Sequence, residues 1–302
     1  MGLRKTATCG LLALSTLAVV ACQKPATDAT ANAAAANAFE TGSLRAVVIG
    51  DGLPMITKEG DTYDGLSMVV LEAIRDQMQT APQAKADSFS IEPVPVASAR
   101  EGLDKIRSGE ADLACGVAFS WERQTSVDYT IPFANGGVRL LAPEGNDGTP
   151  ASLKGQTIGV VQDSVASTVL AASLDDVQFK FFEGPAQALA ALKSGDVKVL
   201  GGDSLWLKAN HKATAPDAVV VPERAYARSG VGCVVGDATP KLLNVSNLAI
   251  GRLLGAYVDN DPAVRSEVNR WIGQDSAIGL SDDQISKFFR IVLATTAQFS
   301  NQ

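Results

Sequence analysis

The stretch Ser98-Ala-Arg-Glu-Gly-Leu-Asp-Lys-Ile-Arg-Ser-Gly-Glu-Ala-Asp-Leu-Ala-Cys-Gly-Val117 places a helix, a helix stop and a strand one after another. Ser98 and Glu101 have the spacing of a capping box, in which each side chain bonds to the other residue's backbone N–H. Gly109 predicts the end of the helix, because glycine readily adopts the left-handed conformation that follows a last helical turn. The apolar run 112–117 then predicts a strand.

Strands and helices also alternate on the N-terminal side of this stretch. The branched apolar run 45–50 predicts a strand, and apolar residues at helical spacing predict an amphipathic helix over 66–78. A second strand is expected over 90–96. Together with the strand at 112–117, this βαβαβ order indicates an α/β fold with a parallel sheet covered by helices.

Parts of this unit recur later in the chain. The segment 103–112 is similar to 189–198, with a helix end, a glycine and a strand start in both, and 47–51 is similar to 159–163. Two similar α/β units predict two lobes of related architecture. Chance similarity between two ordinary βαβ units is the alternative.

Composition excludes several classes of function. The chain has 302 residues, of which 46% are hydrophobic and 20% charged, as in globular proteins of one large or two medium domains. Its net charge of -7 argues against a duplex-binding surface, which needs clustered Lys and Arg. The single histidine, His211, cannot build a site of several imidazoles. Since phosphate-binding and dinucleotide motifs are also missing, we expect no nucleic-acid partner, metal or cofactor.

The N-terminal segment has the pattern of a targeting signal. Arg4 and Lys5 precede the uncharged apolar run 10–21, which would span only about 18 Å as a helix, against roughly 30 Å for a bilayer core. We therefore predict a secretory signal over 1–21. The sequence Val19-Val-Ala-Cys22 resembles the lipobox of bacterial lipoproteins, which implies lipidation of Cys22. An ordinary signal peptide with a cysteine at its cleavage site is the alternative.

Polar residues follow the ends of the predicted strands in both units: Asp51, Arg123, Asp163, Ser164 and Asp203. Ligands of open α/β sheets bind outside the carboxyl ends of the strands. A guanidinium can bind a carboxylate bidentately, and a carboxylate on the opposite lobe would complement an ammonium. This pair is typical of a receptor for an α-amino acid. Taken singly, each residue could be a surface charge or a helix cap.

Three further stretches carry a family resemblance. Ser108–Leu113, Ser120–Arg123 and Val127–Phe133 together resemble the bacterial extracytoplasmic solute-binding proteins of the polar-amino-acid type, family 3. Leu153–Val161 is similar to the strand that opens the second lobe of that family, and Asn269–Gly273 to its C-terminal segment. The resemblance covers roughly residues 42–273.

The resemblance implies an α/β fold, the type II periplasmic-binding-protein clamp, with two lobes that are each a mixed, mainly parallel sheet flanked by helices. Lobe 1 would comprise 41–139 and 228–302, and lobe 2 would comprise 140–227, with two hinge segments between them. The Ala-, Thr- and Asn-rich residues 22–40 would form a flexible tether, since they cannot bury enough apolar surface to fold.

The resemblance also implies ligand contacts. Arg123 would bind the ligand α-carboxylate, with backbone groups of Gly116 and Ala118 beside it. Ser164, at the start of a lobe 2 helix, would hold the same carboxylate, and Asp203 would bind the α-ammonium.

Asp51 is assigned by its position alone, and three other features near these residues differ from the family. Asp51 lies near the family's first contact in lobe 1. Leu53, Pro54 and Met55 stand where the family usually has an aromatic residue that packs on the ligand. Ser67 replaces an acidic residue. Asp163 replaces a small residue and would oppose an anionic ligand unless it points away.

The function implied is extracytoplasmic binding of an amino acid or related zwitterion by clamp closure, for delivery to an ABC permease in the inner membrane. The protein would be a monomer in the periplasm, anchored to a membrane by its lipid. A sensor or orphan receptor without a transporter is the alternative. A periplasmic dehydratase built on the clamp is another, but only Asp163 and Glu183 are conceivable acids, so we expect no enzyme.

Four cysteines leave one pair for a disulfide. Cys9 would leave with the signal and Cys22 would carry lipid, so Cys115 and Cys233 remain in an exported domain. In the fold that the resemblance implies, their strands lie side by side, which predicts a Cys115–Cys233 bridge. Two free buried cysteines are the alternative.

The tail beyond residue 273 runs past the family's usual end. Ser281 and Gln284 have capping-box spacing, and an apolar stripe follows at Ile285, Phe288, Phe289, Val292 and Leu293. We predict a helix over 281–297 docked on the body, with dimerisation through the stripe as the alternative. Trp206 is expected in the core, and Trp121 is a candidate roof of the pocket.

Overall fold

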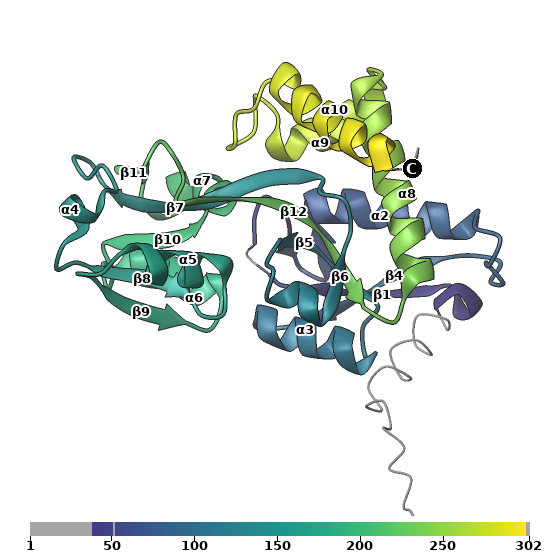
Figure 1. The fold of residues 1–302 in the computed structure, drawn as a ribbon, viewed down its shortest axis with the longest axis horizontal. Helices are drawn as coiled ribbons and strands as arrows, with labels where there is room; N and C mark the ends of the chain where they lie inside the picture. The colour runs from purple at the N-terminus through teal and green to yellow at the C-terminus, as the bar shows by residue number, and fades with distance from the viewer. Residues whose placement is uncertain (1–37, 51, 300–302) are drawn as a thin grey trace, which may run out of the picture.

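The computed structural model describes residues 38–50 and 52–299. Two α/β lobes lie side by side and are joined by two long strands (Figure 1). Lobe 1 contains β1 (Ser43–Val48), β2 (Thr57–Glu59), β3 (Thr62–Asp64), α2 (Leu66–Gln79), β4 (Ser90–Pro95), α3 (Ala99–Ser108), β5 (Leu113–Ala118), η1 (Arg123–Thr125), β6 (Val127–Tyr129), α8 (Pro240–Val258), α9 (Pro262–Ile272) and α10 (Asp282–Phe299).

Lobe 2 is built from the middle of the chain. It contains α4 (Pro150–Leu153), β8 (Thr157–Val161), α5 (Val165–Ser173), β9 (Gln178–Phe182), α6 (Pro185–Ser194), β10 (Val199–Asp203), α7 (Ser204–Thr214) and β11 (Ala218–Val221). The joining strands are β7 (Ala134–Pro143) and β12 (Ala227–Gly236). The lobe boundaries predicted at 139/140 and 227/228 fall within β7 and at the start of β12.

The two lobes have the same strand order. In lobe 1 the parallel strands run β4-β1-β5, with the first strand of the unit in the middle, and in lobe 2 they run β9-β8-β10. An antiparallel strand follows in each, β12 beside β5 and β7 beside β10. The similar segments in the sequence therefore belong to two units of the same topology.

The helix ends of the two units also correspond. Ser98 caps α3 by accepting a hydrogen bond from the Glu101 N–H at 3.2 Å, as the capping box predicts. Gly109 and Gly195 follow α3 and α6 with φ of 77° and 78°, a conformation that disfavours any residue with a Cβ atom. The similarity between 103–112 and 189–198 thus reflects one local structure used twice.

Each lobe has the predicted mixed, mainly parallel sheet, and the sheets of the two lobes are continuous. β7 and β12 pair from Ala134↔Val231 to Val138↔Ala227 and join the two lobes into one ten-stranded sheet. Each of these strands has ten residues and extends about 33 Å, so both reach from one lobe into the other (Figure 1). The backbone groups of the two strands pair with each other between the lobes.

A buried ion pair holds β1 against β5 in lobe 1. The Asp112 carboxylate accepts hydrogen bonds from the Arg45 backbone N–H at 2.7 Å and from the Arg45 guanidinium at 2.7 and 3.2 Å. Burial raises the pKa of Asp112, and Arg45 partly offsets that rise. The Ser-Gly-Glu-Ala-Asp motif therefore places its carboxylate where β5 begins.

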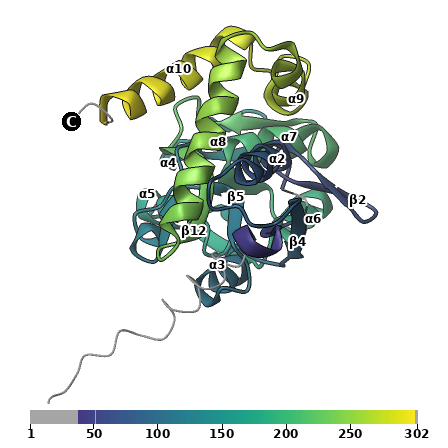
Figure 2. The ribbon, with the colours of Figure 1, turned by 90° about the vertical axis from the view of Figure 1, so that its right-hand side faces the viewer.

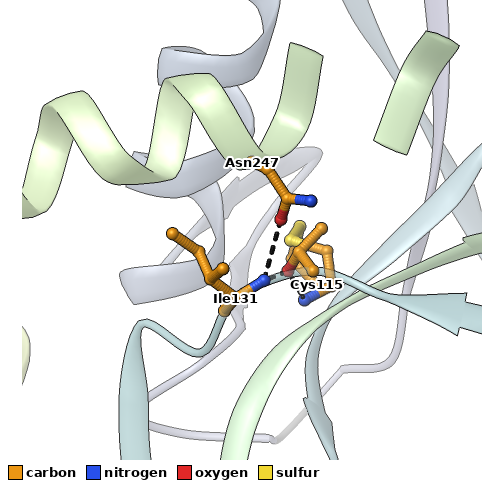
Figure 3. The surroundings of a disulfide bond; sticks show 5 residues. Cys115, Ile131 and Asn247 are labelled. Atoms are coloured by element: carbon orange, nitrogen blue, oxygen red, sulfur yellow. Dashed lines mark hydrogen bonds between the residues drawn. A yellow bond between two sulfur atoms is a disulfide. The ribbon is translucent and has the colours of Figure 1, made fainter. Parts of the chain in front are cut away.

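The predicted disulfide is confirmed. Cys115 on β5 and Cys233 on β12 are direct partners in an antiparallel pair and form a bridge, with Cα atoms 3.9 Å apart. Around the bridge, the Asn247 side chain of α8 accepts a hydrogen bond from the Ile131 N–H at 2.8 Å (Figure 3). The bridge thus links the strand that precedes Arg123 to the strand that returns from lobe 2.

The C-terminal helix is docked within the chain, as its apolar stripe predicts. α10 lies beside α8 and α9 at one end of lobe 1 (Figure 2). Ile285, Phe289 and Val292 are buried, and the Phe289 ring meets the Tyr257 ring of α8 edge-to-face at 5.2 Å. Ser281 and Gln284 form the predicted capping box.

Within 38–50 and 52–299, none of the helices has the length and apolar character needed to span a bilayer. The predicted signal over 1–21 and the lipidation site Cys22 lie outside the described residues, and so does Asp51. Of the predicted tether, Ala38 and Phe39 are buried in the lobe 1 core, so the folded body includes the end of that segment.

Candidate functional site

A cavity of about 260 Å³ lies between the two lobes. Its walls come from the carboxyl ends of β1, β5, β8 and β10, from the first turns of α5 and α7, and from the crossing strands. The strand ends of both units therefore meet at one site, as expected for an α/β sheet. Five of the six predicted ligand-binding residues line it: Gly116, Ala118, Arg123, Ser164 and Asp203.

Arg123 reaches the cavity from the short helix η1, which follows β5. Its guanidinium donates a hydrogen bond to the backbone carbonyl oxygen of Asp163 at 2.6 Å, so it crosses from lobe 1 to lobe 2. Burial raises the pKa of the nearby Tyr129 hydroxyl, and the charge of Arg123 partly offsets that rise. A guanidinium has five N–H donors, which leaves several for a ligand.

Asp163 is not among the residues that line the cavity. The residue has φ of 56°, in the left-handed region that Asp tolerates better than most residues. Its carboxylate accepts hydrogen bonds from the Arg100 guanidinium of α3 at 2.9 and 3.3 Å. The negative charge that could oppose an anionic ligand is therefore paired with a cation of lobe 1.

Asp203 presents a carboxylate from lobe 2 at the start of α7. One oxygen caps the helix by accepting from the Leu205 N–H at 2.8 Å, and the Gly137 and Trp206 backbones also donate to the carboxylate. Burial raises the pKa of Asp203. None of the ion pairs found in 38–50 and 52–299 includes this carboxylate. A Cβ atom on Gly136 would lie 2.0 Å from Asp203 Oδ2, so only glycine leaves room for it.

The other predicted ligand-binding residues already make hydrogen bonds or close contacts within the protein. The Ser164 hydroxyl caps α5 by accepting from the Ser167 N–H at 3.1 Å, and it donates to the Val161 carbonyl at 2.6 Å. The Ala118 carbonyl accepts from the Tyr129 hydroxyl at 3.1 Å. Gly116 has φ of 87°, and a Cβ atom there would lie 2.7 Å from Ser67 Oγ. Contacts to a ligand from these residues therefore depend on backbone N–H groups.

The sequence reasoning missed the apolar character of the cavity. Met55 and Ile56 line it from lobe 1, and Val161 and Val165 line it from lobe 2. Trp206, expected in the core, also lines the cavity, with its ring against Gly202. Its position three residues after Asp203, on the first turn of α7, is the signal that could have placed it there.

Trp121, the candidate roof of the pocket, does not line the cavity. Its side chain is 80% exposed and meets the Phe119 ring edge-to-face at 4.8 Å, in a neighbouring groove. In the described part of the chain no three His, Cys, Asp or Glu side chains gather into a group that could hold a metal ion.

Curated proteins with similar sequences include a sensor and a binding protein. The virulence sensor protein BvgS of Bordetella pertussis is 27% identical over 231 residues, which are 75% of this chain and 17% of the sensor. The L-cystine-binding protein TcyJ of Escherichia coli is 25% identical over 162 residues, which are 53% of this chain and 59% of that protein. The matches thus span less than two thirds of either relative.

Structural similarity extends over most of the chain. The solved structure of an ancestral arginine-binding protein bound to glutamine has a TM-score of 0.66 and 22% identity, over 77% of this chain and 98% of that one. The two proteins therefore share a fold. The family model for bacterial extracellular solute-binding proteins, family 3, matches residues 44–290, which is most of the sequence. The chain belongs to the bacterial extracellular solute-binding proteins, family 3.

Proposed function

We propose that this protein binds an α-amino acid or a related zwitterion between its lobes and delivers it to an ABC importer. One observation carries the proposal: the interlobe cavity has a guanidinium, Arg123, from lobe 1 and a carboxylate, Asp203, from lobe 2. A zwitterion with an α-carboxylate and an α-ammonium complements that pair. The named ligands of TcyJ and of the ancestral arginine-binding protein, which are amino acids, support it.

In this proposal the ligand carboxylate binds Arg123 and backbone N–H groups of Gly116, Ala118 and the first turn of α5, which Ser164 caps. The N-terminal end of a helix favours an anion there. Asp203 binds the ammonium. Asp51, which follows β1 in the sequence, remains a predicted contact. Closure of the lobes around the ligand would bring the two charged ends to opposite walls.

A sensor without a transporter is the second candidate. It is favoured by the match between 75% of this chain and 17% of the virulence sensor BvgS. Both candidates need the same ligand site and differ only in what the closed clamp contacts. We also propose that the protein is not an enzyme.

The N-terminal segment supports a proposal about location. A signal over 1–21 and lipidation of Cys22 would leave a monomeric periplasmic domain anchored to a membrane. Mass spectrometry of the exported protein tests this, because a diacylglyceryl group on Cys22 changes the mass of the N-terminal peptide.

Calorimetry with amino acids tests the ligand proposal on the chain from residue 23 onward. A micromolar ligand binds with roughly -8 kcal/mol. Arg123→Ala and Asp203→Ala should each cost about 2–5 kcal/mol, because each leaves one charge of the ligand unpaired in a closed site. Arg75→Ala and Asp76→Ala, which remove a surface ion pair of α2, are the matched controls. Wild-type affinity in either cavity variant would show that its residue does not bind the ligand.

A further inference from the structure

We infer that the ligand of the interlobe cavity carries an uncharged, apolar side chain. The inference rests on the proposed function and deepens it. Among the described residues that line the cavity, Arg123 and Asp203 are the charged ones. Both are used by the α-carboxylate and α-ammonium of the ligand. None of the described lining residues would then supply a counter-charge to a charged ligand side chain, and burying an unpaired charge is strongly unfavourable.

The hydroxyl groups of the cavity are also engaged. Ser164 Oγ donates to the Val161 carbonyl oxygen at 2.6 Å, and Ser229 Oγ donates to the Phe119 carbonyl oxygen at 3.2 Å. A hydroxyl has one proton to donate. Neither serine therefore offers a free donor to a polar ligand side chain.

Apolar side chains face the cavity from both lobes. Met55, Ile56 and Val117 line it from lobe 1, and Val161, Val165 and Trp206 from lobe 2. A Cβ atom on Gly116 would lie 3.0 Å from Met55 Cβ, so the methionine packs directly over β5. Met55 stands where the family usually has an aromatic residue, and its flexible thioether can adapt to ligands of different shape.

The size of the cavity limits the ligand to one amino acid. Sites for drug-sized ligands have volumes of about 300–1,000 Å³. The volume here, about 260 Å³, lies below that range. A single residue with an aliphatic, thioether or phenyl side chain suits this space better than a dipeptide.

The test is a comparison of amino acids by calorimetry on the chain from residue 23 onward. Leucine, methionine and phenylalanine form the apolar set, and arginine, lysine and glutamate form the charged set. We expect at least one apolar amino acid to bind tenfold or more tightly than every charged one. Met55→Glu should weaken apolar binding by tenfold or more, whereas Met55→Leu should stay within about threefold. Val165→Glu makes the same test from lobe 2 if Met55→Glu does not fold.

The same comparison separates the two levels of the proposal. If arginine or lysine binds most tightly, the apolar inference is wrong and the amino-acid function stands. Loss of that binding in the Asp51→Asn variant would then identify Asp51 as the counter-charge. If glutamate binds most tightly, the inference is equally wrong. If no amino acid binds while the chain remains folded, the proposed function itself fails, and the inference with it.

Discussion

At the scale of single residues, the Asp203 carboxylate is both a helix cap and the candidate ammonium site. Three backbone N–H groups donate to it, from Leu205, Trp206 and Gly137. An ionised carboxylate can accept about four hydrogen bonds, so one position is left for a ligand. Capping orients the carboxylate before any ligand arrives, on a residue that lines the cavity.

Ligand affinity should fall as the pH drops through the pKa of Asp203. Burial raises the pKa of Asp203 above the ordinary value of an aspartate, so its proton competes with the ligand ammonium at higher pH than usual. The dissociation constant should be flat above that pKa and should rise about tenfold for each pH unit below it. Calorimetry between pH 4 and 8 measures it. An equal pH dependence in Asp203→Asn would assign the effect to another group.

At the scale of elements, α10 completes the core of lobe 1. Phe289 is 2% exposed and contacts Tyr257 of α8, while Arg265 of α9 pairs with Asp282 at 3.1 Å. Ile291, on the opposite side of the same helix, is 56% exposed. The helix therefore buries one face and is anchored at its first turn by a charge.

Deleting 280–302 should lower the melting temperature of a monomer by roughly 10 °C or more, because it exposes the apolar face beneath α10. Phe289→Ala should cost about 3–5 kcal/mol of unfolding free energy. Ile291→Ala is the matched control and should change it by about 0.5 kcal/mol or less. Scanning calorimetry and light scattering provide the measurements. Unchanged melting, or loss of a dimer on truncation, would argue against docking within the chain.

The Cys115–Cys233 bridge should leave no free thiol in the chain from residue 23 onward when it is denatured without reductant. The closed loop has a sequence separation of 118 residues, for which the chain-entropy model gives about 4–5 kcal/mol at most. The double variant Cys115→Ser, Cys233→Ser should lower the free energy of unfolding by up to that amount, measured by chemical denaturation. Two thiols in a titration of the unreduced chain would contradict the bridge.

At the scale of the whole molecule, two arginines of lobe 1 donate hydrogen bonds to one residue of lobe 2, Asp163. Asp163 accepts hydrogen bonds from Arg100 through its carboxylate and from Arg123 through its backbone. Arg100 does not line the cavity, whereas Arg123 lines it and is a candidate ligand contact. These bonds can therefore form only when the lobes are close together.

Removal of the Arg100–Asp163 pair should weaken ligand binding without any direct contact to the ligand. The two side chains are 69% and 42% exposed, so solvent screens the pair and its effect on affinity should be at most about fivefold. We expect Arg100→Ala to raise the dissociation constant by up to that factor and to increase the radius of gyration in X-ray scattering. Lys154→Ala, which breaks the Lys154–Asp176 pair inside lobe 2, is the control. Equal effects from both variants would exclude a role in closure.

The sequence by itself determined the local structure and the family. Capping residues, helix-ending glycines and apolar periodicity act over a few residues, so Ser98, Gly109 and the stripe on α10 could be interpreted from spacing alone. The resemblance placed Cys115 beside Cys233. The chain order of strands and polar residues was enough to place Arg123 and Asp203 at strand ends.

Only the tertiary structure decided what surrounds these residues. The pairing of Asp163 with Arg100, the joining of two sheets through β7 and β12, and the apolar walls with Met55 and Trp206 all depend on how the lobes sit against each other. Such contacts join residues that are tens to more than a hundred positions apart. Their geometry follows from the packing of the whole chain, which no local pattern of residues encodes.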